Sequence, residues 1–326
     1  MSAHTPSQHK VLELFASLPV PVLAAPMFLV SGPQLLNACC RAGIIGSMPA
    51  PNARTVEILE QWLEQITAER EQAQAAGETL APWMLNMIVH STYDRFAAEL
   101  ELVKRFQPPI VSTALGSPKR VLEDVHAYGG VVMADVITPA MARKAADAGV
   151  DALILVCNGA GGHTGTNNPF AFVDEVRRFW DGPLGVAGAI SNGRDVHAAQ
   201  VLGYDFAVVG TRLIATHESL VDDDYRQMLV DCHMDDVVLS KAVSGVLANW
   251  MRPSMEKAGI DANAEGKASV DFSGNIASAN KAWKHVWSAG QGVGQITRPC
   301  SVAELVSELV DGYRASLDRP QGHNRR

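Results

Sequence analysis

The sequence predicts an α/β protein, a (β/α)8 TIM-type barrel with a helical insertion near the carboxyl end. Eight short apolar segments with the composition of buried strands occur within residues 1–210, and helical segments separate them. Most of these segments are apolar throughout, which is typical of parallel strands covered on both faces. Glycine-rich turns follow several of them, at the strand ends where barrels bind ligands. An open doubly wound sheet stays the alternative, because strand order cannot be read from one sequence.

The strand and helix segments alternate along the chain. The predicted strands are residues 20–26, 43–47, 83–89, 110–115, 130–135, 152–156, 184–190 and 205–210. The predicted helices between them are residues 32–41, 55–76, 93–106, 119–127, 139–148, 170–179 and 194–202. Apolar residues recur at helical spacing along the longest of these helices, and its opposite face is charged. A short amphipathic stretch, residues 11–18, precedes the first strand.

The chain changes character after residue 217. Residues 218–290 are richer in charge and methionine, with helical signals at 223–229, 241–249 and 277–287 and no obvious strand. A last helix over residues 302–317 would return to the outside of the barrel. We therefore expect a barrel made of residues 1–217 plus 291–326, and a helical insertion of residues 218–290 that covers the mouth of the barrel.

Charge and cysteine content limit the partners of the protein. The net charge of −8 argues against nucleic acid, which needs a basic face. The five cysteines are scattered without metal or disulfide spacing, which indicates a reducing compartment. No apolar stretch approaches the ~18 residues of a membrane span, and the start of the chain is polar. We expect a cytoplasmic protein with no membrane or metal partner; the oligomeric state stays open, with a homodimer as one option.

Residues 153–165 combine a buried strand with a glycine-rich loop that carries His163. Glycines surround this histidine, so no apolar packing role is evident for it. A histidine in a loop at a strand end can act as a general base or a hydrogen-bond donor near pH 7. The alternative is that its ring only holds the loop closed through main-chain hydrogen bonds.

Other strand ends offer further candidate residues. Residues 188–193 and 210–212 follow the seventh and eighth strands, where main-chain amides of barrels commonly bind phosphate; the alternative is that their glycines serve only to turn the chain. Asp135 ends the fifth strand, either facing the site or capping the next helix. Cys157 is interpreted as a buried apolar residue, and Asp222 as part of a charged helix start.

Several segments together resemble the nitronate monooxygenase family, formerly called 2-nitropropane dioxygenases. They are Pro-Val-Leu-Ala-Ala-Pro-Met at 21–27, Asn86, Ala-Gly-Gly-His-Thr-Gly at 160–165, Val-Ala-Gly-Ala-Ile at 186–190 with Gly193, Gly-Thr-Arg at 210–212 with Ala215, Thr216 and Glu218, and Trp-Ser-Ala-Gly-Gln-Gly-Val-Gly at 287–294. The segments occur in the family's order and span nearly the whole chain. Each alone is weak, but the combination is specific.

The resemblance implies an FMN-dependent oxidoreductase that converts alkyl nitronates, or nitroalkanes, and O2 to a carbonyl compound and nitrite. His163 matches the family's catalytic histidine, as a residue that binds the substrate or removes its proton. The cofactor-binding residues implied by the match are Ala25, Pro26, Met27, Asn86, Asp135, Gly161, Gly162, Ala187, Gly188, Ala189, Gly210, Thr211, Ser288 and Gln291. The FMN phosphate would lie against Gly210 and Thr211.

Two positions depart from the family's pattern. Gly159 stands where many relatives carry a glutamate, and Asp135 where they often carry a lysine near the flavin. A carboxylate in place of a cation would oppose the reduction of an anionic flavin, unless it is protonated or points away. The alternative function is an FMN-dependent reductase that uses NAD(P)H to reduce a quinone or an enoyl thioester. A barrel that binds a phosphorylated metabolite, or flavin, without turnover is the non-redox alternative.

Overall fold

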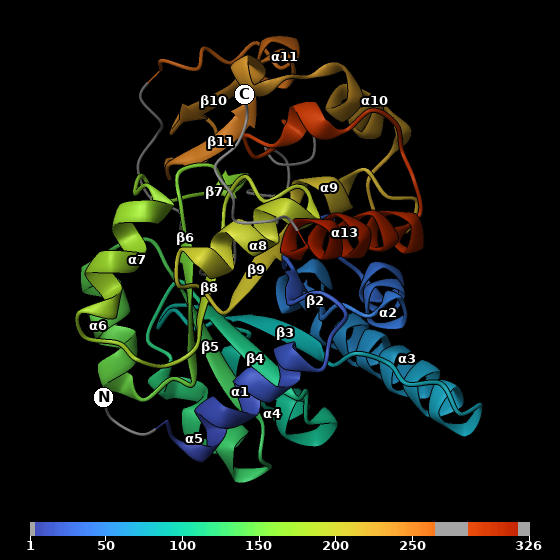
Figure 1. The fold of residues 1–326 in the computed structure, drawn as a ribbon, viewed down its shortest axis with the longest axis vertical. Coiled ribbons are helices and arrows are strands. Elements are labelled where there is room, and N and C mark those ends of the chain that lie inside the picture. Colours follow the sequence, from blue (N-terminus) through green and yellow to red (C-terminus); the bar gives the residue numbers. More distant parts are fainter. Residues whose placement is uncertain (1–3, 265–285, 319–326) are drawn as a thin grey trace.

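The eight parallel strands form a barrel in the computed structural model, which describes residues 4–264 and 286–318 (Figure 1). The barrel strands are β1 (Val22–Ala24), β2 (Gly46–Pro49), β3 (Trp83–Ile88), β4 (Ile110–Ala114), β5 (Val131–Val136), β6 (Ala152–Val156), β8 (Leu184–Ala187) and β9 (Phe206–Val209). They pair in the order β1-β9-β8-β6-β5-β4-β3-β2. A parallel bridge between Leu23 and Ile45 joins the two ends of this order. The barrel prediction is therefore confirmed, and the open doubly wound sheet is wrong.

Helices cover the outside of the barrel, and side-chain caps begin several of them. They are α2 (Pro33–Ala42), α3 (Val56–Ala75), α4 (Phe96–Phe106), α5 (Lys119–Ala127), α6 (Pro139–Ala148), α7 (Pro169–Arg177), α8 (Gly193–Val201) and α13 (Val302–Leu317). The Thr55 and Thr138 side chains accept a hydrogen bond from the first turn of α3 and α6. Helix α13 packs between α8 and α2, as expected for a last helix that returns to the barrel.

The amino-terminal end of the barrel is filled by side chains. Helix α1 (Pro6–Ala16) lies across this end, and its buried Val11 and Phe15 join the apolar cluster inside the strands. The Phe15 ring stacks on Phe206 with ring centroids 4.0 Å apart. Gly185 makes this stack possible, because a Cβ there would lie 2.2 Å from the Phe206 ring.

The segment between β9 and α13 contains both helices and strands. It includes α9 (Thr211–Ile214), α10 (Asp223–Asp231), η2 (Met234–Asp236), β10 (Val237–Ser240), β11 (Ala248–Met251), α11 (Arg252–Lys257) and η3 (Val293–Gln295). Helix α10 confirms the helix predicted at 223–229. The helix predicted at 241–249 is wrong, because a turn and β11 occupy this range. The helix predicted at 277–287 lies largely outside the described residues.

The unexpected strands connect the insertion to the glycine loop. Strands β10 and β11 pair antiparallel, and β11 also pairs with β7 (Gly162–His163). The pairing sets Ala248 opposite His163. The insertion therefore lies directly beside the candidate histidine, at the carboxyl end of the barrel (Figure 1).

Candidate functional site

A cavity of about 1110 Å³ opens at the carboxyl ends of the barrel strands. Nearly all candidate residues from the sequence line it: Ala25, Pro26, Met27, Asn86, Asp135, Gly161, Gly162, His163, Ala187, Gly188, Ala189, Gly210, Thr211 and Ser288. Gln291 is not among the lining residues. Its main-chain amide donates to the Gly159 carbonyl oxygen (3.0 Å), which fastens the segment after the insertion to the glycine loop.

The floor of the cavity is polar on one side and apolar on the other. Alternation along β3, β4 and β5 directs Asn86, Ser112 and Asp135 toward the inside of the barrel, two residues beyond interior apolar side chains. Asn86 Nδ2 donates to Ser112 Oγ (2.8 Å). The next strands around the barrel, β6 and β8, carry Val156 and Ala187, which pack on the interior apolar cluster. A flat ligand on this floor would therefore meet polar groups along one edge.

Asp135 faces this cavity rather than a helix. The cap of α6 is Thr138, whose Oγ1 accepts from the Met141 amide (3.2 Å), so the helix-cap reading of Asp135 is wrong. Burial raises the pKa of the Asp135 carboxyl to about 7, because loss of water disfavours the charged form. The carboxyl can therefore carry a proton near neutral pH.

The His163 side chain is exposed to the cavity while protein surrounds it on its other sides. This burial lowers the pKa of the imidazole below its usual value of 6.5. At neutral pH the ring is therefore predominantly uncharged and can accept a proton. Strand pairing of β7 with β11 fixes the main chain that carries it.

Side chains of neighbouring segments hold the glycine loop in place. Asn249 Nδ2 donates to the carbonyl oxygens of Asn158 (2.9 Å) and Ala160 (2.7 Å). Thr164 Oγ1 donates to the Cys157 carbonyl oxygen (2.7 Å). These contacts tie the glycine loop to β11 and to its own main chain.

Residues 288–292 press against the glycine loop and against Thr211. The Gly290 amide donates to Thr211 Oγ1 (2.9 Å). A Cβ at Gly290 would lie 2.6 Å from the Gly159 carbonyl oxygen, so no larger residue fits without movement. Trp287 stacks on Tyr225 with centroids 4.9 Å apart, and the Tyr225 hydroxyl donates to the Ser288 carbonyl oxygen (2.6 Å). Trp287 is therefore packed against α10.

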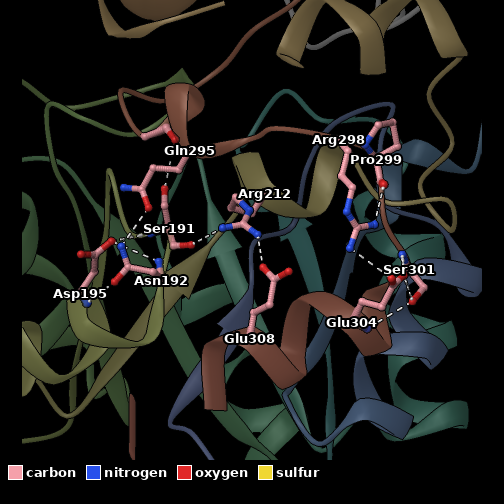
Figure 2. A network of polar contacts seen from close by, with 11 residues as sticks. Ser191, Asn192, Asp195, Arg212, Gln295, Arg298, Pro299, Ser301, Glu304 and Glu308 are labelled. Atoms are coloured by element: carbon pink, nitrogen blue, oxygen red, sulfur yellow. Dashed lines mark hydrogen bonds and ion pairs between the residues drawn. The ribbon is translucent and has the colours of Figure 1, made fainter. Parts of the chain in front are cut away.

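A polar network behind the phosphate-candidate loops fixes their position (Figure 2). The Arg212 guanidinium donates to the Ser191 carbonyl oxygen (2.9 Å) and pairs with Glu308 of α13 (2.7 Å). Asn192 Nδ2 donates to Gln295 Oε1 (2.9 Å). Arg212 thus links the loops after β8 and β9 to the last helix, and its charge is directed at Ser191 and Glu308.

Two other residues discussed from the sequence, Cys157 and Asp222, have structural roles outside the proposed chemistry. Cys157 is a free, buried thiol whose pKa burial raises to about 12, which fits its interpretation as an apolar residue. Asp222 caps α10 through the Tyr225 amide (2.9 Å), as expected for a charged helix start. In the part of the chain that the structure describes, no helix is long and apolar enough to cross a membrane.

Sequence reasoning missed several residues that shape the site. Asn52 accepts from the Leu29 amide (2.9 Å) and donates to the carbonyl oxygens of Met27 (2.9 Å) and Ser31 (2.7 Å), which orders the loop after β1. Asn249 plays a similar part for the glycine loop. Asn52 and Asn249 are distant in sequence from the loops that they hold, and an isolated asparagine has no sequence pattern that predicts such a role. Only the fold therefore reveals the part that these two residues play.

Comparisons with known proteins agree with this geometry. The nitronate monooxygenase family model matches residues 10–312. A nitronate monooxygenase from Paraburkholderia phytofirmans is 28% identical, and the match covers 92% of this chain and 93% of the relative. A (3aS,4S,5R,7aS)-5-hydroxy-7a-methyl-1-oxo-octahydro-1H-indene-4-carboxyl-CoA dehydrogenase from Rhodococcus jostii is 26% identical over 69% of this chain and 61% of its own length.

Solved structures share the fold. A nitroalkane oxidase from Streptomyces ansochromogenes superposes with a TM-score of 0.80 at 23% identity, covering 94% of this chain and 99% of that one. FabK from Thermotoga maritima gives a TM-score of 0.76 at 23% identity, with 95% and 97% covered. The match of the family model across most of the sequence is the decisive finding. The chain belongs to the nitronate monooxygenase family of oxidoreductases.

Proposed function

We propose that this enzyme binds FMN in the cavity and oxidises alkyl nitronates with O2 to a carbonyl compound and nitrite. The observation that carries the proposal is His163, an uncharged imidazole that faces a large cavity from the glycine loop paired with β11. The family match and the nitronate monooxygenase from Paraburkholderia phytofirmans support the reaction class. The partners of the protein are then a small-molecule substrate and O2.

The residues around the cavity fit FMN. Gly210 and Thr211 line the cavity, and Gly210 has no side chain to keep a phosphate from its main chain. Amides of the loop after β8, which Arg212 fastens, would add donors. The Asn86 amide, held by Ser112, would meet a polar edge of the ring. When bound, FMN supplies the electron-transfer chemistry that no protein side chain offers.

His163 and the walls of the cavity would do the remaining work. The imidazole holds the nitro oxygens of the substrate by hydrogen bonding, or takes the proton from the reacting carbon of a neutral nitroalkane. A pKa below 6.5 keeps the ring in the form that accepts a proton at neutral pH. The glycine loop and residues 288–292 position the substrate and exclude water from it.

The test is an anaerobic titration of the purified FMN-loaded protein with the nitronate of nitroethane. Loss of the oxidised flavin absorbance, followed by nitrite release once air is admitted, is the expected result. Flavin that stays oxidised after a large excess of nitronate would refute the reaction. The control is the same titration with neutral nitroethane, which reports proton removal separately from electron transfer.

A second function, an FMN-dependent reductase driven by NAD(P)H, has one observation in its favour. Asp135 places a carboxyl in the cavity, and its charged form would disfavour an anionic nitronate. The acceptor would then be a neutral quinone or an enoyl thioester. Anaerobic addition of NADH or NADPH to the same sample decides between the two, because only the reductase bleaches its flavin with these donors and not with nitronate.

A further inference from the structure

Part of the cavity wall is made of large apolar side chains that are exposed. Leu115, Ile137, Met141 and Val246 all line the cavity. Their exposed fractions are 40%, 37%, 41% and 36%, unusual values for such residues on the inner side of a folded protein. They come from the loops after β4 and β5, the first turn of α6 and the turn between β10 and β11. Exposed apolar surface gathered in a concave site is typical of ligand binding.

This apolar wall, defined as Leu115, Ile137, Met141 and Val246, adjoins His163 through the main chain. The Thr164 amide donates to the Leu247 carbonyl oxygen (3.3 Å), which ties the β10–β11 turn to the residue after His163. On the other side, Asn167 Nδ2 donates to the Ile137 carbonyl oxygen (2.8 Å). Both anchors join segments of the apolar wall to the loop that carries His163.

The size of the cavity leaves room for more than one ligand. Its volume of about 1110 Å³ exceeds the range of roughly 300–1,000 Å³ that is usual for one small ligand. The glycine loops and Asn86 lie where FMN would bind, whereas the apolar wall offers no polar side chain to a phosphate or a ring edge. A second ligand with an apolar surface would cover this wall.

We infer that the substrate carries an alkyl chain several carbons long, which the apolar wall buries while the reacting carbon lies beside His163. The inference rests on the proposed function and narrows its substrate class. Small nitronates would leave the four side chains in water. Only longer substrates would therefore gain binding energy from the apolar wall. Because the alkyl chain of the substrate is remote from the reacting carbon, its burial raises kcat/KM chiefly by lowering KM.

The first test uses the nitronates of nitroethane, nitrobutane, nitrohexane and nitrooctane with the FMN-loaded enzyme. We expect kcat/KM to rise about fourfold for each added methylene until the wall is covered. Equal kcat/KM values across the series would overturn the inference while leaving the proposed reaction intact.

A second test measures binding without turnover. Affinities of 1-butanol to 1-decanol for the FMN-loaded protein are read from the perturbation of flavin absorbance or fluorescence. Affinity that rises with chain length supports the apolar wall, even where nitronate leaves the flavin oxidised and the proposed reaction fails. Affinity that is independent of chain length overturns the inference.

Matched variants locate the effect on the wall. Met141→Gln and Val246→Thr replace exposed apolar side chains by polar ones of similar size, so the fold loses little packing. The control is Phe170→Gln, a residue at the start of α7 that is 62% exposed and does not line the cavity. In both wall variants the total rise in kcat/KM from nitroethane to nitrooctane should be severalfold smaller than in the wild type. In the control the rise should stay at the wild-type value. A wild-type rise in kcat/KM in the wall variants would mean that the alkyl chain of the substrate binds elsewhere, and would overturn the inference.

Discussion

At the scale of single residues, burial shifts the pKa values of Asp135 and His163, which both line the cavity, in opposite directions. It raises the pKa of Asp135 to about 7 and lowers that of His163 below 6.5. Both shifts have one cause, the loss of water around a charge, and both favour the uncharged form near pH 7. The cavity therefore combines a potential proton donor with a potential proton acceptor, without a permanent charge on either.

The role of His163 can be separated from substrate binding with two forms of one substrate. His163→Gln keeps a hydrogen-bonding side chain but removes the base. We expect kcat/KM for neutral nitroethane to fall by about 10²- to 10⁴-fold, and that for its preformed nitronate to fall much less. FMN content, measured by absorbance, should stay at the wild-type level. An equal loss for both forms would mean that His163 acts by binding rather than by proton transfer.

Asp135 predicts a pH dependence with a definite sign. Its carboxyl is protonated below about pH 7 and charged above it, so kcat/KM for an anionic nitronate should fall as pH rises through about 7. The free energy of unfolding should also fall as pH rises from 3.8 to about 7. Across this interval the folded protein keeps the proton on Asp135 while the unfolded chain loses it, so the stabilisation by protonation is lost as pH rises.

The variant that checks this dependence is Asp135→Asn, which keeps the shape without the charge. We expect a flatter profile of kcat/KM against pH and a higher kcat/KM above pH 7. Urea unfolding at pH 5 and pH 8 should show a smaller difference between the two pH values in the variant than in the wild type. A variant that retains the wild-type profile would assign the titration to another group.

At the scale of elements, periodicity predicts regular segments well and irregular ones poorly. The helix expected at 55–76 is observed as Val56–Ala75, because Thr55 and Ala76 serve as its caps. Strands β10 and β11 were missed, because each has only four residues and β11 also pairs with β7, which is distant in sequence. The glycine motifs led to the part of the cavity lining at residues 159–165, 187–191 and 210–211. The apolar wall was not predicted, since exposed apolar residues in loops carry no pattern, and the positive φ of Leu115 (59°) cannot be read from sequence.

The contact between residues 288–292 and the glycine loop offers a test at this scale. Gly290→Ala would bring a Cβ to 2.6 Å from Gly159 O and 3.1 Å from Thr211 Oγ1, so the two segments must separate. We expect FMN to bind more weakly and the protein to lose roughly 1–3 kcal/mol of stability, measured by FMN titration and urea unfolding.

The matched control for that variant is Gly294→Ala in the same segment. Its added Cβ would meet its nearest neighbour at 3.6 Å, an ordinary van der Waals contact. FMN affinity and stability should stay near the wild-type values in this variant. Equal effects of the two substitutions would show that the segment as a whole tolerates no side chain, and that the contact with Gly159 is not decisive.

At the scale of the whole molecule, the barrel separates stability from chemistry along its axis. Helix α1 and the stacked rings of Phe15 and Phe206 fill the amino-terminal end, while the cavity lies at the carboxyl ends of the strands. The interior layers of Met84, Ile110 and Met133 lie between the two ends. A substitution at the amino-terminal end of the barrel therefore changes the free energy of unfolding without contacting a residue of the cavity lining.

Phe15→Ala is the variant that tests this separation. Loss of a buried ring that is 3% exposed should lower the free energy of unfolding by about 3–5 kcal/mol, measured by urea denaturation. FMN affinity and kcat/KM, determined at a temperature where the variant stays folded, should remain within about twofold of wild type, because additivity holds for distant sites. Glu13→Ala, on the exposed side of the same helix, should change neither quantity. A large fall in kcat/KM for Phe15→Ala in fully folded protein would mean that packing at the closed end sets the geometry of the cavity, and that the two ends of the barrel are coupled through its interior layers.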